Sequence, residues 1–238
     1  MTEERRVLPF DYNDDVFRHG KEANALYHSI LLPEFRDVHP LIADRLAAAK
    51  PGLVLDLGCG PTKLGALLDE RGVRWVGVDV AARRLSLGNG PRVLGEAVSL
   101  PFAGESFGAV AALYMLYHFD DPMVPIREAY RVLQPGGLVA ACAPSRDDDP
   151  ELAPFLPARP LETFDSDNAP DLLGQVFEIV RIDSWDMPLY RLPDADAVWT
   201  YLVSRMTPAE VASEIARKVE TPLWLTKRGG TVWGRKRA

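Results

Sequence analysis

The sequence has little cysteine, no long apolar run and no excess of positive charge. Its two cysteines, Cys59 and Cys142, are too few for a disulfide framework or a cysteine-rich metal site, so we expect reduced thiols and no bound metal. No apolar stretch approaches the ~20 residues of a membrane-spanning helix, and the N-terminus lacks the apolar core of a signal peptide. These absences predict a cytoplasmic protein without a membrane span.

The charge balance is acidic, with a formal net charge of −7. A large nucleic-acid footprint needs a basic face, so this balance argues against a nucleic-acid partner. We interpret the basic residues at 235–237 as a solvated tail. With 47% hydrophobic and 26% charged residues among 238, the composition is that of one globular α/β domain with a modest addition. It does not predict the oligomeric state.

The chain does contain a short apolar segment that ends in a glycine turn. Residues 53–57 have the pattern of a buried strand, Gly58 and Gly60 lie one residue apart, and a helical pattern follows over 63–71. Glycine tolerates positive φ and leaves room for a ligand against the backbone. In open α/β sheets, such turns lie at the carboxyl end of a central strand, where nucleotides bind.

An acid follows the glycine turn at the spacing found in nucleotide-binding folds. The second predicted strand, 73–79, ends in Asp79, about 20 residues after Gly60, where an acid accepts hydrogen bonds from a ribose. The alternative is that Asp79 is a turn residue or the N-cap of the next helix, predicted over 81–87. Lys63 stands where the Gly-x-Gly-x-x-Gly fingerprint needs its third glycine, which argues against a nicotinamide dehydrogenase.

Several segments resemble motifs of one family, in the right order. Asp-Leu-Gly-Cys-Gly at 56–60 resembles motif I of the class I S-adenosylmethionine-dependent methyltransferases. The branch that includes ubiquinone and menaquinone biosynthesis enzymes (methyltransferase type 11-like) has motifs similar to those at 95–102, 106–108, 116–122 and 127–137. The chain departs from the family pattern at Thr62, Glu96 and Gly108, where glycine, aspartate and aspartate are usual.

The resemblance implies a Rossmann-like α/β fold, with a mostly parallel seven-stranded sheet and helices on both faces. We expect a single methyltransferase domain over 1–238. Its parts would be N-terminal helices or a lid at 1–50, a cofactor-binding core at 51–145 and a substrate-side region at 146–238. The last part would hold a helical insertion before the final strand.

Patterns along the chain predict the remaining elements. Helices are expected at 37–50 and 171–175, and 194–219 is expected to be helical, with a helix start at 207–210. Strands are expected at 106–114, 138–143, 176–185 and 231–235, and 92–102 is expected to be a short strand followed by an irregular loop. Pro135 to Gly137 are interpreted as a turn. The acidic run Asp147–Asp149 is interpreted as part of a solvated loop, since no histidine accompanies it to make a metal site. Aromatic residues of the insertion, Tyr190 and Tyr201 among them, could line a pocket, although core packing is the simpler interpretation.

The resemblance also implies which residues bind S-adenosyl-L-methionine. They are Asp56, Gly58, Cys59, Gly60, Asp79, Val80, Glu96, Ala97 and Leu113. In this scheme Glu96 accepts a hydrogen bond from the adenine amino group, the Ala97 amide serves a ring nitrogen, and Leu113 lies under the methionine part. Substrate contacts are expected from Tyr12, Tyr114, Tyr117 and Arg146.

His118 is the candidate general base, because it is the only histidine after residue 39 and follows the fourth predicted strand. Its alternative role is a hydrogen bond within the loop. A base is needed only if the acceptor is a hydroxyl or phenol, whereas an amine, thiolate or activated carbon needs mainly positioning and exclusion of water. Nothing separates O-, N- and C-methylation.

The sequence therefore favours a methyltransferase that acts on a small-molecule acceptor. Two alternatives stay open: a non-catalytic binding protein with this fold, which Thr62 and Gly108 favour, and a methyltransferase acting on RNA or protein.

Overall fold

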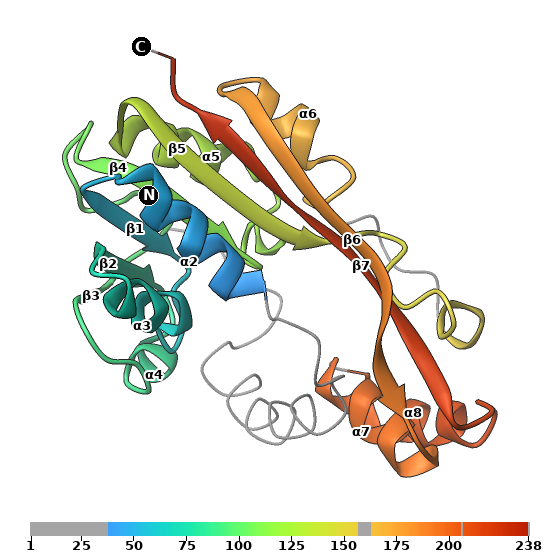
Figure 1. Cartoon of the computed structure of the whole chain (residues 1–238). Helices are drawn as coiled ribbons and strands as arrows, with labels where there is room; N and C mark the ends of the chain where they lie inside the picture. The colour runs from blue at the N-terminus through green and yellow to red at the C-terminus, as the bar shows by residue number, and fades with distance from the viewer. Residues whose placement is uncertain (1–37, 157–162, 206, 238) are drawn as a thin grey trace, which may run out of the picture.

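The computed structural model describes residues 38–156, 163–205 and 207–237 (Figure 1). The expected N-terminal lid falls largely, and Tyr12 entirely, outside the described residues. The first described element is helix α2, Val38–Ala49, which agrees with the helix predicted over 37–50.

The strands form one seven-stranded sheet in the order β3-β2-β1-β4-β5-β7-β6, which confirms the expected fold class. The first five strands in this order pair in parallel, whereas β7 is antiparallel to both β5 and β6. The strands are β1 Leu53–Leu57, β2 Arg74–Asp79, β3 Arg92–Leu94, β4 Phe107–Leu113, β5 Leu133–Pro144, β6 Glu178–Leu192 and β7 Leu223–Arg235.

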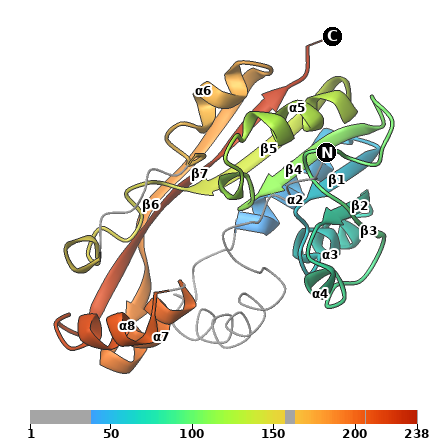
Figure 2. The same cartoon turned by 180° about the vertical axis from the view of Figure 1, so that it is seen from behind.

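Helices cover both faces of the parallel part, so its central strands are apolar on both sides. Helices α2 and α3 (Lys63–Glu70) share a buried cluster with Val54 and Ala109. On the other face, which Figure 2 brings to the front, α5 (Met123–Val132) shares a buried cluster with Leu55 and Val110. Helix α6 (Ala169–Gly174) joins this cluster from its place against β6 and β7. Because β1 pairs in parallel with β2 and β4, the carboxyl ends of these three strands lie at one edge of the sheet, which we call the open edge. Helix α4 (Ala82–Leu85) follows β2 there, and the 3₁₀ turn η1 (Leu116–His118) follows β4.

The structure explains two departures from the family pattern. A Cβ on Gly108 would lie 1.8 Å from the carbonyl oxygen of Pro51, so no side chain fits there. Thr62 has φ +59, the left-handed conformation that glycine usually adopts, and its buried Oγ1 accepts a hydrogen bond of 3.0 Å from the Asn89 amide. Both residues thus have a local structural reason.

Three predictions about strand length were wrong. Strands β6 and β7 run as one long antiparallel hairpin, paired from Glu178 with Arg235 to Leu192 with Leu223. Gly229 lies inside β7, and a Cβ there would come 2.3 Å from the ring of Trp185, so this position of the strand needs glycine. Strand β5 begins at Leu133, before the expected turn; its register against β4 shifts over that stretch.

The far end of this hairpin has a core of its own. Helices α7 (Ala195–Ser204) and α8 (Ala209–Ala216) occupy the stretch predicted as helical, with α8 beginning at the predicted helix start, and lie at the end distant from α2 and β1 (Figure 1). They enclose a buried cluster separate from the two under the parallel strands; its largest member is Tyr201, 1% exposed. Tyr201 is therefore a core residue.

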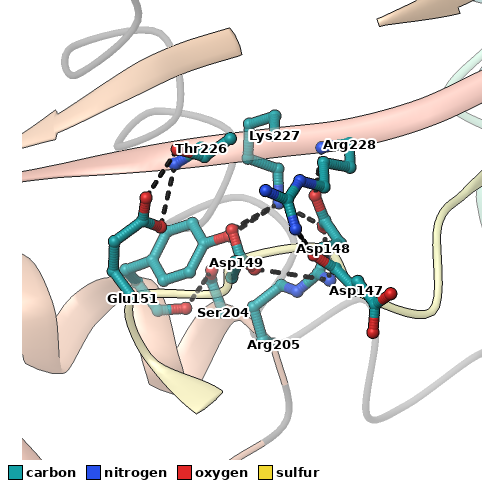
Figure 3. A network of polar contacts seen from close by, with 10 residues as sticks. Asp147, Asp148, Asp149, Glu151, Ser204, Arg205, Thr226, Lys227 and Arg228 are labelled. Atoms are coloured by element: carbon teal, nitrogen blue, oxygen red, sulfur yellow. Dashed lines mark hydrogen bonds and ion pairs between the residues drawn. The ribbon is translucent and has the colours of Figure 1, made fainter. Parts of the chain in front are cut away.

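The prediction of a solvated acidic loop was wrong for two of its three residues. Asp147 is exposed, but Asp148 and Asp149 are only 5% and 2% exposed. Figure 3 shows them facing Lys227 of β7 and Arg205, which follows α7. The ammonium of Lys227 contacts Asp148 and lies 2.7 Å from Oδ1 of Asp149. Sequence reasoning missed these cations because they lie more than 50 residues further along the chain.

Glu151, a further acid of this loop, also makes contacts that hold the loop in place. The carboxylate of Glu151 accepts hydrogen bonds from the amide and hydroxyl of Thr226, at 3.0 and 2.5 Å (Figure 3). These contacts join the loop after β5 to strand β7 of the hairpin.

Within the described residues, no helix is long and apolar enough to cross a membrane.

Candidate functional site

The glycine turn after β1 is held against the end of β2. The amides of Gly58 and Cys59 both donate to the carbonyl of Val78, at 2.8 and 3.1 Å. Gly58 and Gly60 have φ of +71 and +48, and a Cβ on Gly58 would lie 2.9 Å from the side chain of Met115. The turn therefore needs glycine for its conformation and, at Gly58, for space.

Asp79 joins β2 to this turn. Its Oδ2 accepts a hydrogen bond of 2.8 Å from the Gly60 amide, and its Oδ1 accepts one of 2.8 Å from the Ala81 amide. The second bond is a local turn contact two residues along the chain, whereas the N-cap of α4 is Ala81, which has no side-chain capping bond. The first bond fixes the carboxylate beside the glycine turn. Each carboxylate oxygen can accept a further hydrogen bond, so Asp79 can also serve a ligand hydroxyl. The neighbouring Val80 is 47% exposed, which leaves an apolar surface next to it.

Asp56, at the end of β1, is buried and incompletely satisfied. It is 3% exposed, and its Oδ2 has no hydrogen-bond partner in the described structure. Burial raises the pKa of Asp56 to about 7, the charge of His39 opposes this rise, and the charge of Asp79 adds to it. A buried polar atom without a partner is uncommon in proteins and points to a ligand contact.

Cys59 of the turn is a structural thiol. It is buried, and burial followed by the nearby charges of Asp56 and Asp79 raises the pKa of its thiol. The thiol is therefore uncharged at neutral pH, which argues against nucleophilic chemistry at this cysteine. Its contribution to the site is the backbone amide of the turn.

The end of β4 brings Leu113 and Tyr114 to the same edge. Leu113 is buried, and Tyr114 has a positive φ of 56°, a conformation that costs a bulky residue energy and is common near functional sites. The Tyr114 amide donates to the carbonyl of Cys142 at 2.9 Å, and the ring lies 6.2 Å from that of His39. Burial, with Cys142 close by, raises the pKa of the Tyr114 phenol well above its usual value, so it stays protonated.

Tyr117 and His118 follow in η1, with ring centroids 4.4 Å apart. Burial, followed by the positive charge of Arg84, lowers the pKa of His118 to about 4. The imidazole is therefore neutral at neutral pH and can accept a proton, although at this pKa it is a weak base. Sequence reasoning identified both residues, but not the position of Arg84.

The other predicted residues divide into two groups. Glu96 and Ala97 follow β3, the neighbour of β2; Glu96 is exposed and its carbonyl accepts from the Ser99 amide at 3.2 Å, while Ala97 is buried. Arg146 lies beyond β5 and pairs with the buried Asp165 at 3.0 Å. It holds the loop after β5 to the start of α6, and the structure does not bring it to the glycine turn.

Three residues that line this region were not assigned to the site from sequence. The charge of His39, on α2, acts on Asp56. Met115 packs on Gly58, and Arg84 of α4 lies over Gly60. Arg84 carries a possible signal, since it follows Asp79 by five positions, but a charged residue there has a solvated helix face as its ordinary interpretation. Within the described residues, no group of three or more histidines, cysteines and acids could hold a metal ion.

Comparison with solved structures establishes the fold. The YcgJ protein of Bacillus subtilis superimposes with a TM-score of 0.63 at 20% identity, covering 84% of this chain and 98% of that one. The cyclase SpnF superimposes with a TM-score of 0.62 at 15% identity, covering 95% and 96%. At these identities the likeness concerns the fold alone, and the fold is that of the class I methyltransferases.

Sequence comparison identifies the core more closely. Residues 55–141 match the methyltransferase domain family. A demethylmenaquinone methyltransferase of Corynebacterium kroppenstedtii is 37% identical over 97 residues, which are 39% of this chain and 42% of that protein. An uncharacterized methyltransferase of Mycobacterium tuberculosis is 36% identical over 114 residues, 46% of each chain. The resemblance to the S-adenosylmethionine-dependent methyltransferases is thus confirmed, while the match spans less than half the length of these relatives.

Proposed function

We propose that this protein is an S-adenosylmethionine-dependent methyltransferase with a small-molecule acceptor. The observation that carries the proposal is the open edge where the glycine turn, Asp79 and the incompletely satisfied Asp56 meet. A buried carboxylate oxygen without a partner suits a ligand that brings a hydrogen-bond donor or a positive charge. S-adenosylmethionine brings both, in its ammonium group and its ribose hydroxyls.

The residues of the edge fit the parts of this cofactor. In the proposal, Asp79 accepts from the ribose hydroxyls, Val80 offers its exposed apolar side chain to the adenine, and Asp56 receives the ammonium group. Glu96 and the Ala97 amide take the polar edge of the adenine. The backbone of Gly58, Cys59 and Gly60 lies along the ligand, and Leu113 supports its methionine part.

The chemistry asks little of the protein beyond positioning. When bound, S-adenosylmethionine supplies a methyl group on a positively charged sulfur. The chain's own residues would orient the acceptor, exclude water and, for a hydroxyl acceptor, take up a proton. His118 is the proposed proton acceptor because its imidazole is neutral, and Tyr114 and Tyr117 are the proposed contacts of the acceptor. Arg146 is a weaker candidate, since its guanidinium already pairs with Asp165.

The acceptor is proposed as a small molecule on two grounds. Relatives of the matched core include demethylmenaquinone methyltransferases, whose names state a small-molecule substrate. The net charge of −7 gives no general attraction for nucleic acid. The proposed division is a cofactor-binding core at 51–145 and a substrate-side region at 146–238. Because the matched segment ends at residue 141, the relatives do not transfer a particular acceptor to this chain.

Titration calorimetry with S-adenosylhomocysteine, the demethylated product, tests the proposal on the wild-type protein and two variants. Asp79→Ala should weaken binding by about 1–3 kcal/mol, because it removes charge-assisted hydrogen bonds to the ribose. Asp171→Ala removes an exposed acid on α6 and should leave the affinity unchanged. Circular dichroism checks that each sample is folded. A folded wild-type protein that binds neither this product nor S-adenosylmethionine would contradict the proposal.

A further inference from the structure

Arg84 reaches from α4 over the glycine turn. Its Nη2 and Nε lie 3.2 and 3.3 Å from the point that a Cβ on Gly60 would occupy. The absence of a side chain on Gly60 therefore leaves room for a guanidinium against the turn. Because α4 follows β2 and the turn follows β1, this contact closes over the carboxyl edge of the two strands.

The guanidinium of Arg84 has no acidic partner in the described part of the chain. Arg71, Arg131 and Arg146 each have a carboxylate oxygen within 3.0 Å, whereas no described carboxylate lies within 4.0 Å of Arg84. Asp79, the acid at the end of β2 that holds this turn, accepts from the amides of Gly60 and Ala81. A half-buried cation beside the proposed ligand site thus has no ion-pair partner within 4.0 Å among the described residues.

A second observation places this charge on the inner side of the site. The positive charge of Arg84 adds to burial in lowering the pKa of His118, which lies in η1 after β4. Arg84 is therefore close enough to both the β1 turn and the β4 end to act on groups at each. Its guanidinium lies over Gly60, within electrostatic reach of His118.

The cofactor proposed above has a single anionic group, the carboxylate of its amino-acid end. Its sulfur and ammonium group are positive, and its ribose and adenine are neutral, so the carboxylate is the part of the ligand that an unpaired guanidinium over the turn would attract. Guanidinium and carboxylate form strong, often bidentate hydrogen bonds. We infer that Arg84 binds the carboxylate of the cofactor's amino-acid end and thereby selects ligands that carry it. This inference rests on the proposed function.

Two ligands separate this role from other roles of Arg84. S-adenosylhomocysteine carries the carboxylate, whereas methylthioadenosine has the same adenosine and sulfur but no amino-acid end. Calorimetry with both ligands is to be done on wild type, Arg84→Ala, Arg84→Lys and Arg74→Ala. The last is the matched control, since Arg74 is an exposed arginine at the opposite end of β2.

In Arg84→Ala, the affinity for S-adenosylhomocysteine should fall about tenfold or more, because a charge-assisted pair is lost. The affinity of Arg84→Ala for methylthioadenosine should change less than about twofold. The affinity of Arg84→Lys for S-adenosylhomocysteine should lie between those of wild type and Arg84→Ala. Arg74→Ala should bind both ligands like wild type. Raising the salt concentration should weaken the binding of S-adenosylhomocysteine more in wild type than in Arg84→Ala.

Two results would overturn the inference while leaving the proposed function intact. One is an unchanged affinity of Arg84→Ala for S-adenosylhomocysteine, which would direct attention to an anionic acceptor. The other is an equal loss for both ligands, which would mean that Arg84 shapes the adenosine site. If the folded wild type binds neither ligand, the proposed function itself fails.

Discussion

Two buried acidic sites lie along this sheet, and their surroundings are opposite. Asp148 and Asp149, beyond β5, are compensated by the ammonium of Lys227 and the guanidinium of Arg205. Asp56, at the end of β1, has an oxygen without a hydrogen-bond partner and a pKa raised by burial to about 7. The pKa of Asp149 is lowered: burial alone would raise it, but the charge of Lys227 and then of Arg205 outweighs burial.

The difference indicates what each site is for. A paired set of buried charges is complete without a ligand and fixes how segments pack. A buried acid that lacks a partner carries an energetic cost in the free protein, and a ligand can remove that cost. The comparison assigns structure to the network around Lys227 and binding to the site around Asp56.

The largest effect should come from breaking the paired site. Lys227→Ala leaves Asp148 and Asp149 buried without their main cation, so the free energy of unfolding should fall by about 3–5 kcal/mol. Urea denaturation at pH 7 measures it. The control is Arg228→Ala on the same strand, which removes a pair with the exposed Asp186 and should cost about 0–1 kcal/mol. Equal losses in the two variants would mean that the network is not a distinct energetic unit.

Asp56→Asn should raise the free energy of unfolding, whereas Lys227→Ala lowers it. It removes a charge that the folded protein buries at a cost, so the ligand-free protein should gain about 1–3 kcal/mol at pH 8. The folded-state pKa is raised, so the wild type binds more protons folded than unfolded, and its stability falls as pH rises from about 4 through 7. The gain in Asp56→Asn should therefore shrink as pH is lowered toward 5, as urea denaturation at several pH values would show.

The same variant should lose binding while it gains stability. The proposed ammonium contact needs the ionised carboxylate, so affinity for S-adenosylhomocysteine should rise with pH through about 7 in wild type and show no such rise in Asp56→Asn. An Asp56→Asn protein that binds like wild type at pH 8 would show that this acid is not a ligand.

The smallest effect should come from trimming one exposed valine in each region. Val80→Ala, next to Asp79, removes apolar surface from the proposed adenine contact and should weaken binding by about 0.5–1 kcal/mol. Val211→Ala removes the same atoms from α8, where the side chain is 39% exposed, and should leave binding unchanged. Similar calorimetric affinities for the two variants would argue against an adenine contact at Val80.

The sequence predicted the parallel half of the fold well because its signals are local. The run before Gly58, the acid at Asp79 and the apolar strand before Tyr114 each lie within one short segment. Most strand and helix bounds there agree with the structure to within one or two residues; the exceptions are α5, for which no helix was predicted, and β5, which starts earlier. The fold family was recognisable for the same reason, since its motifs are contiguous.

The antiparallel half was harder because its reasons are distant in the sequence. Gly229 is required by Trp185 across the hairpin, and Asp149 is buried only because Lys227 and Tyr201 reach it. None of these pairings leaves a spacing that can be detected along the chain. At the site, the backbone and acid positions were predictable, whereas Arg84 was not, because its contact depends on the direction in which α4 leaves β2.

The position of β7 between β5 and β6 also bears on how the chain is made. Strand β6 has β7 as its only hydrogen-bonded neighbour in the sheet, and β7 comes after it in the sequence. During synthesis, roughly thirty residues separate the end of β6 from the start of β7, which corresponds to about 2–6 s at common elongation rates. Until then β5 is an open edge and β6 has no partner, so this interval is when the nascent chain is most exposed to pairing with the wrong strand.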